Sequence, residues 1–162
     1  MLSNIYSNLR NTSSCLILLA FCLVGCDFRS GPTLAEVHNT NIKKLRAAYS
    51  FYLVTHNLNG PENEEELKGY LKNNAGAKVK MERIEVLPEQ VDDIFVSERD
   101  GKPFKVRYGL QGYSDHAIVF EAEGVDGKRL VAFNIPRDLD PKDYEAAWAG
   151  KLNLDSARDV FE

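Results

Sequence analysis

Apolar side chains recur at helical spacing through the first part of the chain that has a folded pattern. Thr33 followed three residues later by Glu36 is a signature of a helix start, and Asn57, Asn59 and Gly60 favour its end. Apolar and aromatic residues recur between these signals at Leu34, Val37, Ile42, Leu45, Tyr49, Tyr52 and Leu53. Because the spacing from Ile42 to Tyr52 is three, four and three residues, it predicts one long helix with this face buried.

Two shorter helices are predicted from their starts. Pro61 suits a first helical turn, where its missing N–H is no loss, and the glutamates at 62, 64, 65 and 66 would lie at the positive end of that helix. Asp140-Pro141 marks a similar start near the C-terminus, and that helix should end at Gly150. The inward residues are Leu67, Tyr70 and Leu71 in the first of these helices, and Tyr144, Ala147 and Trp148 in the second.

Alternating apolar and polar residues between these helices predict short strands. The segments are 78–87 (a weak pattern), a run with Ile94 and Val96, and the clearer runs 104–108, 118–121 and 130–135. Asp100-Gly101 and Asp126-Gly127 suit tight reversals between strands. The predicted fold class is α+β: a long and a short N-terminal helix packed on a small antiparallel meander, with a short C-terminal helix.

The N-terminal segment has a different pattern. Residues 15–25 form an uncharged apolar run, and Arg10 is the single cationic side chain before it. Eleven helical residues reach only ~16 Å, about half of the hydrocarbon core of a bilayer. This length is typical of the apolar part of a signal peptide. The alternative, a buried core helix, would show polar residues on one side, and the run shows none.

The end of this run and the cysteine directly after it, Leu23-Val24-Gly25-Cys26, resemble the lipobox of bacterial lipoprotein precursors. The resemblance implies cleavage after Gly25, attachment of diacylglycerol to the Cys26 sulfur, and export to a membrane surface. It divides the chain into a signal peptide (1–25), a lipidated tether (26–32), one domain (33–150) and a tail (151–162) that we expect to be mobile. Several acyl chains on one residue hold a protein stably at a bilayer.

Composition limits the chemistry of the processed chain. All three cysteines lie at or before Cys26, so processing and lipidation would leave no free thiol for disulfides, zinc–cysteine sites or a cysteine nucleophile. Loss of Arg10 with the signal would change the formal net charge from −4 to −5. Lysines and arginines are interleaved with acids, which disfavours a nucleic-acid partner. The lipid, rather than surface charge, would then supply membrane attachment.

Candidate catalytic and metal-binding groups all have simpler interpretations. Ser114-Asp115-His116 contains the residue types of a hydrolase triad, but neighbours on an extended chain point to opposite faces. The three histidines lack metal-ligand spacing, and the Asp-Gly dipeptides suit turns better than calcium loops. Glu121 and Glu123 lie on one strand face, where they form either a paired-carboxylate site or, as we expect, an outward polar face. No cofactor or metal is predicted.

A second resemblance covers about residues 41–133. The stretch from Tyr49 to Tyr52, then Gly60-Pro61, and the turns at 100–103 and 124–127 are similar to the globular region of type II secretion pseudopilins. Lys128-Arg129 follows the second turn where that family has calcium-binding acids, and the export signal is of the lipoprotein kind. The resemblance therefore implies the outline of the fold and nothing about filament assembly.

The leading functional hypothesis is a non-catalytic structural or partner-binding module, anchored in the cell envelope by lipid at Cys26. The expected contact with an envelope protein is either the sheet face or the aromatic helix stripe with Tyr49 and Tyr52. The alternative is an envelope hydrolase that uses carboxylates such as Asp126 and Glu121. The hypothesis rests on one observation: no set of catalytic residue types stands out in the sequence.

Overall fold

The computed structural model describes residues 38–112 and 116–152 of the 162-residue chain. Its first described helix, α3 (Asn41–Thr55), buries the predicted face from Ile42 to Leu53. The predicted helix start is wrong, because residues 38–40 are not helical; Thr33 and Glu36 lie outside the described residues. The helix begins where the Asn41 N–H donates to a Glu98 carboxylate oxygen at 2.8 Å.

Helix α4 (Glu64–Asn73) begins three residues later than Pro61 suggests. The side chain of Asn63 caps it by accepting the Glu66 N–H at 2.9 Å, and three glutamates occupy its first turn as predicted. Leu67 and Leu71 lie one turn apart and are buried, which confirms most of the predicted inward stripe.

Residues 78–87, predicted as a strand, are instead the end of helix α5 (Ala75–Glu82) and a turn. The Asn74 side chain begins this helix by accepting the Ala77 N–H at 3.0 Å. Ala77 and Met81 face the core one helical turn apart, whereas Val79 is 51% exposed. The burial therefore follows the helical period, and the weak alternation around Val79 is coincidental.

The run with Ile94 and Val96 is also not a strand. Two short 3₁₀ helices, Pro88–Gln90 and Asp93–Phe95, occupy this region and bury Ile94 and Phe95. Only an isolated bridge between Val96 and Pro103 remains of the predicted strand pairing.

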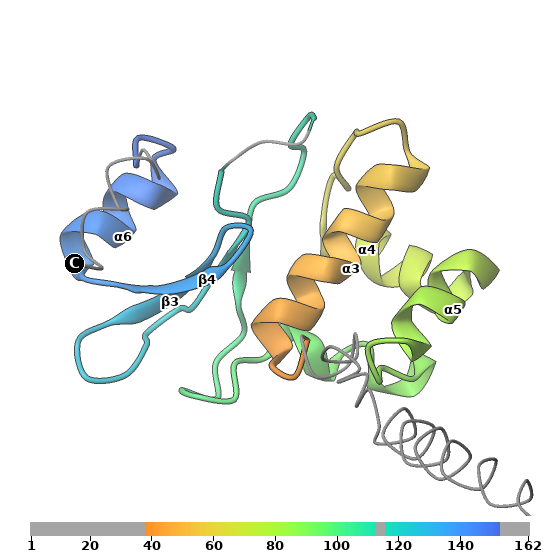
Figure 1. Ribbon diagram of the computed structural model, residues 1–162, viewed down its shortest axis with the longest axis horizontal. Coiled ribbons are helices and arrows are strands. Elements are labelled where there is room, and N and C mark those ends of the chain that lie inside the picture. Colours follow the sequence, from red (N-terminus) through yellow and green to blue (C-terminus); the bar gives the residue numbers. More distant parts are fainter. Residues whose placement is uncertain (1–37, 113–115, 153–162) are drawn as a thin grey trace, which may run out of the picture. The chain divides into compact units, whose positions relative to one another are not determined.

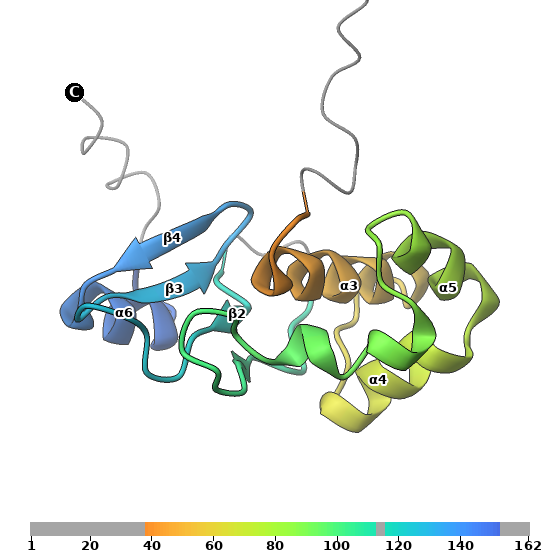
Figure 2. The same ribbon diagram turned by 90° about the horizontal axis from the view of Figure 1, so that it is seen from below.

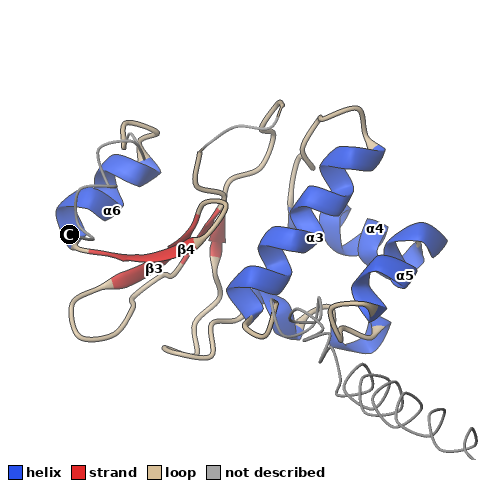
Figure 3. Cartoon of the chain, viewed as in Figure 1, coloured by secondary structure: helices blue, strands red, loops and turns tan. Residues whose placement is uncertain are grey.

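The sheet contains strands β1 (Lys105–Val106), β2 (Val119–Phe120), β3 (Arg129–Ala132) and β4 (Pro136–Leu139), all antiparallel and in chain order (Figure 3). This confirms the predicted meander, with shorter strands than the alternation suggests. Strand β4 is missing from the prediction. Its first residue, Pro136, pairs with Ala132 at the sheet edge, where a residue without an N–H is tolerated. Ile135, predicted in the third strand, lies in the β3–β4 turn and is 69% exposed.

Helices cover both faces of the sheet (Figures 1 and 2). Neighbouring residues of a strand point to opposite faces, so Val119 packs in the cluster of α3 and Phe120 in the cluster of α6 (Pro141–Trp148). The second cluster consists of Ala117, Phe120, Val131, Phe133, Tyr144 and Ala147. The architecture is an α+β fold with α3, α4 and α5 on one side of the sheet and α6 on the other.

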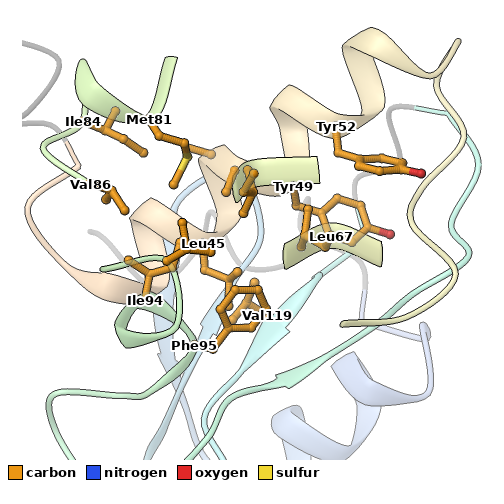
Figure 4. Packing of buried hydrophobic residues seen from close by; sticks show 14 of the residues in the cluster. Leu45, Tyr49, Tyr52, Leu67, Met81, Ile84, Val86, Ile94, Phe95 and Val119 are labelled. Atoms are coloured by element: carbon orange, nitrogen blue, oxygen red, sulfur yellow. The ribbon is translucent and has the colours of Figure 1, made fainter. Parts of the chain in front are cut away.

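The larger core cluster joins the helical layer to the sheet. Figure 4 shows Leu45 and Tyr49 of α3, Leu67 of α4 and Met81 of α5 in one cluster with Val119 of β2. Residues from four elements therefore share one interior, and α3 packs against α4, α5 and β2.

Helix α6 begins as predicted, with the Asp140 side chain accepting the Asp143 N–H at 2.9 Å. The first two residues of the predicted tail, Lys151 and Leu152, contact the domain. Lys151 donates its N–H to the Ala146 carbonyl at 2.8 Å, and Leu152 packs against the second cluster. Residues 153–162 lie outside the described part of the chain.

Candidate functional site

Tyr49, one of the two predicted partner contacts, is completely buried. Two loop segments close over it: the Gly60 N–H donates to the Leu110 carbonyl at 2.7 Å, and the Gly112 N–H donates to the Leu58 carbonyl at 2.8 Å. Glycine fits at position 60 because it has no side chain; a Cβ atom there would overlap the Tyr49 hydroxyl. The prediction that this ring forms part of a contact surface is therefore wrong.

Tyr52, the second predicted contact, is 4% exposed. Its ring stacks on His56 with centroids 3.8 Å apart, and its hydroxyl donates to a carboxylate oxygen of Glu66. Burial and the Glu66 carboxylate raise the pKa of Tyr52. The Tyr52 prediction is wrong for the same reason as that for Tyr49. The predicted contact through the sheet face stays a prediction: the cores of α3 and α6 lie on its two sides, whereas Lys105 of β1 and Asp138 of β4 are exposed.

Glu121 and Glu123 do not form a pair of catalytic carboxylates. Glu121 is fully buried, and its two carboxylate oxygens accept hydrogen bonds from the Ser97 hydroxyl at 2.8 Å and the Leu130 N–H at 2.7 Å. Glu123 is exposed and lies 3.6 Å from Lys102. The expected outward face is thus wrong for Glu121, whose carboxylate is held by internal donors.

Arg99 partly neutralises this buried carboxylate. Its Nε atom lies 3.6 Å from Glu121, and its Nη1 atom lies 2.5 Å from Asp138 of β4. The Asp138 hydrogen bond raises the pKa of Arg99, and the charge of Glu121 adds to that shift. Arg99, Glu121 and Asp138 therefore join the 97–102 loop to β4 and to the residue after β2, which is a structural role.

The two turns that carry the pseudopilin resemblance are in direct contact. Asp100 accepts the Gly124 N–H at 2.8 Å and the Glu123 N–H at 3.2 Å. Asp126 and Gly127 have φ of 53° and 77° and connect Val125 to Lys128 as a two-residue hairpin turn. Both Asp-Gly dipeptides therefore serve as turns, and Asp126, the other carboxylate of the hydrolase alternative, is exposed at the hairpin tip.

The remaining candidates for chemistry do not assemble. Ser114 and Asp115 lie outside the described residues, and His116 is exposed. His38 precedes α3 and His56 caps its other end. Among residues 38–112 and 116–152, no three His, Cys, Asp or Glu side chains lie close enough together to hold a metal ion.

A pocket of about 200 Å³ lies where the start of α3 meets the β3–β4 turn. Figures 1 and 2 show this turn near the first residues of α3. The pocket is lined by His38, Lys43, Arg46, Asn134, Ile135 and Pro136. It therefore combines three nitrogen bases with an exposed apolar side chain at its rim.

Arg46 is fixed as part of the pocket wall. Its Nε atom donates to the Phe133 carbonyl at 3.0 Å, one Nη atom donates to Asn134 at 3.2 Å, and the other contacts the Ser50 hydroxyl. Lys43 makes no ion pair among the described residues, and the Nδ1 atom of His38 has no hydrogen-bond partner there. Burial lowers the pKa of His38; a backbone hydrogen bond with Lys43 opposes this shift, and the Lys43 charge adds to it.

The candidate catalytic residues do not indicate this pocket, but the charge of α3 does. The sequence of α3 contains Lys43, Lys44 and Arg46 and no acidic residue. Such an imbalance on one helix, in a chain that is acidic overall, indicates a local patch of positive charge.

Comparison with family models, with curated proteins and with solved structures gives no match. The fold and the pocket are therefore interpreted from the chain itself. None of the helices within the described ranges has the length and apolar character needed to cross a bilayer. Cys26, the tether and the signal segment lie outside those ranges.

Proposed function

We propose that this chain is an exported lipoprotein of the cell envelope whose α+β domain is a non-catalytic, partner-binding module. The observation that carries the proposal is Leu23-Val24-Gly25-Cys26, in which the last three residues of an uncharged apolar run of eleven (15–25) are followed directly by Cys26. That run is too short to span a bilayer, whereas acyl chains on Cys26 would hold the domain at one.

The buried carboxylate supports a binding role over the hydrolase alternative. A general acid or base has to reach its substrate, and Glu121 has no exposed surface and both oxygens occupied. Asp126 is exposed on a hairpin turn, where its φ of 53° reflects the turn geometry. A partner would therefore meet exposed side chains outside the core, of which the large apolar ones are Val54, Val79, Leu87, Val96, Val125, Ile135 and Trp148.

The anchor is tested by Cys26→Ser in cells supplied with a labelled fatty acid. The label should be lost from the chain, and the domain should no longer be held at the membrane by acyl chains. Cys22→Ser is the matched control, since it makes the same substitution inside the apolar run but leaves the proposed acceptor sulfur. Unchanged labelling of Cys26→Ser, or a native mass that still includes Met1 and no acyl chains, would contradict the proposal.

A further inference from the structure

The pocket between α3 and the β3–β4 turn has a mostly apolar lining to which two cationic residues, Lys43 and Arg46, contribute. Lys43 supplies an ammonium without an ion pair in the described structure, and Arg46 adds a guanidinium that internal hydrogen bonds hold in place. Guanidinium and ammonium groups are the usual partners of phosphate oxygens in proteins. A volume of about 200 Å³ is several times the space that one water molecule takes in the liquid, about 30 Å³.

The charges around the pocket favour an anion over a cation. Helix α3 has no acidic residue over its fifteen positions, and its first turn holds Lys43 and Lys44. Glu98 is the carboxylate at this end of the helix, and it is occupied by the Asn41 N–H and does not line the pocket. Placing two cations at the positive end of a helix is unfavourable on its own, and a bound anion would offset it.

Ile135 indicates what kind of phosphate the pocket meets. It is the most exposed large apolar residue among those described, at 69%, and it stands at the rim beside Pro136. An apolar side chain next to a cluster of cations suits a membrane interface, where phosphates and the ends of acyl chains lie close together. A soluble phosphate would leave Ile135 in water.

The position of the pocket in the chain agrees with a membrane as the occupant. Eleven residues separate Cys26 from His38, which lines the pocket. Twelve chain steps span at most about 40 Å when fully extended. With Cys26 acylated, His38 and the pocket that it lines are therefore kept within that distance of the bilayer surface.

We propose that this pocket binds the phosphate of anionic lipid headgroups in the bilayer that holds the chain, with Ile135 entering the interface. The inference rests on the proposed function, because the Cys26 anchor is what keeps the domain at the membrane. It adds an orientation: the first turn of α3 and the β3–β4 turn face the lipid.

The test uses the processed, lipidated protein with an environment-sensitive fluorophore on Ile135→Cys, which would carry the one free thiol of that chain. It is reconstituted into phosphatidylcholine vesicles with and without phosphatidylglycerol. The emission should shift to the blue only when phosphatidylglycerol is present. The same probe on Val79→Cys, which is 51% exposed on α5, is the control and should not respond.

A charge variant tests the phosphate contact directly. Lys43→Gln should reduce the ratio of membrane-contacting to free probe about fivefold at a fixed lipid composition, the effect of one cation at an anionic surface. Lys105→Gln, exposed on β1, should leave the ratio unchanged. Arg46 is left intact because its hydrogen bonds hold the pocket wall together.

The outcomes separate the two proposals. A probe at position 135 that ignores phosphatidylglycerol, or that responds equally to Lys43→Gln and Lys105→Gln, would overturn the orientation while leaving the anchor intact. A response to inorganic phosphate in phosphatidylcholine vesicles would overturn it in favour of a soluble anion. Lack of acylation at Cys26, read from the mass of the same sample, would instead defeat the proposed function; a blue shift on added phosphatidylglycerol vesicles would then still support the pocket.

Discussion

The hydroxyl of Ser97 donates a 2.8 Å hydrogen bond to the carboxylate of Glu121, and both side chains are buried. The bond joins a loop to the residue that directly follows strand β2, across 24 residues of sequence. A buried carboxylate is costly unless its oxygens are paired, and here Ser97, the Leu130 N–H and Arg99 pair them. Glu121 is therefore a structural residue of the interior, like the buried apolar residues around it.

Removal of this carboxylate should destabilise the fold strongly. Glu121→Ala leaves the Ser97 hydroxyl and the Leu130 N–H without their acceptor and opens a cavity, so we expect the free energy of unfolding to fall by about 2–4 kcal/mol. Glu123→Ala is the matched control, because that side chain is exposed and its change should be within about 0.5 kcal/mol. Urea denaturation measures both, and equal effects would contradict the buried role of Glu121.

A methyl group at position 60 should disturb the cover over Tyr49. Its Cβ atom would overlap the Tyr49 hydroxyl and lie 2.8 Å from the Leu110 carbonyl oxygen. We expect Gly60→Ala to cost about 1–3 kcal/mol of stability, as overpacking of a filled interior does. The change in melting temperature gives the measurement.

Gly69→Ala provides the opposite expectation within the same protein. Gly69 lies inside α4, and nothing stands within 4 Å of the position its Cβ would take. Alanine there should stabilise the helix by roughly 0.5–1 kcal/mol, because glycine loses more backbone entropy on folding. A loss of stability in both variants would show that the local space around each glycine does not decide the outcome.

The hairpin at residues 124–128 should depend on Gly124 more than on Gly127. Both have positive φ, of 78° and 77°, but a Cβ at 124 would also overlap the Lys128 carbonyl, whereas a Cβ at 127 would meet nothing. Gly127→Ala should therefore cost about 1–2 kcal/mol for backbone strain alone, and Gly124→Ala should cost more. The melting temperatures of the two variants measure this, and a larger loss for Gly127→Ala than for Gly124→Ala would contradict the steric argument.

Acid should weaken the fold through Asp100. Burial acts to raise the pKa of this carboxyl, but the N–H groups of Gly124, Lys102 and Glu123 outweigh it and hold the pKa below the usual 3.8. A carboxyl with a depressed pKa in the folded state adds stability above its unfolded pKa, and that stability is lost as the pH falls through the folded value. The free energy of unfolding should therefore decrease below about pH 4.

Asp100→Asn separates this carboxyl from the others. The amide keeps an acceptor oxygen for the Gly124 N–H but does not titrate, so stability measured by urea denaturation should change less between neutral pH and about pH 3 than in the unaltered protein. An identical pH dependence would assign the acid effect to other carboxylates. Asp92 is one of them, because Lys72 and Lys68 lower its pKa.

The sequence predicts the elements whose signals are local. The three-four-three spacing from Ile42 to Tyr52 matches the buried face of α3, the Asp-Gly dipeptides lie in turns, and the three clearest alternating runs overlap β1, β2 and β3. The sequence does not predict helix α5 for two reasons. Asn74 suits the end of α4, which it also caps, as well as the start of α5, and Val79 and Met81 alternate by chance. Only the period from Ala77 to Met81 distinguishes a helix there.

The candidate site could not be predicted, because its geometry depends on contacts far apart in the chain. Tyr49 and Tyr52 form an apolar stripe in the sequence, and nothing local says that loops from residues 58–61 and 109–112 will cover Tyr49. Glu121 likewise looks outward until Ser97 is placed beside it. The pocket brings Lys43 and Asn134 together across 91 positions, and the local hint was the absence of acids in α3.

The border position of β4 bears on self-association of this protein. An unpaired strand border offers its backbone to any extended chain, and a second copy could lengthen the sheet there. Pro136 provides no donor at the first of the four positions, and Arg137 and Asp138 place charges on the next two. Copies held close together, as the proposed lipid anchor would hold them, are thus discouraged from joining edge to edge along this strand.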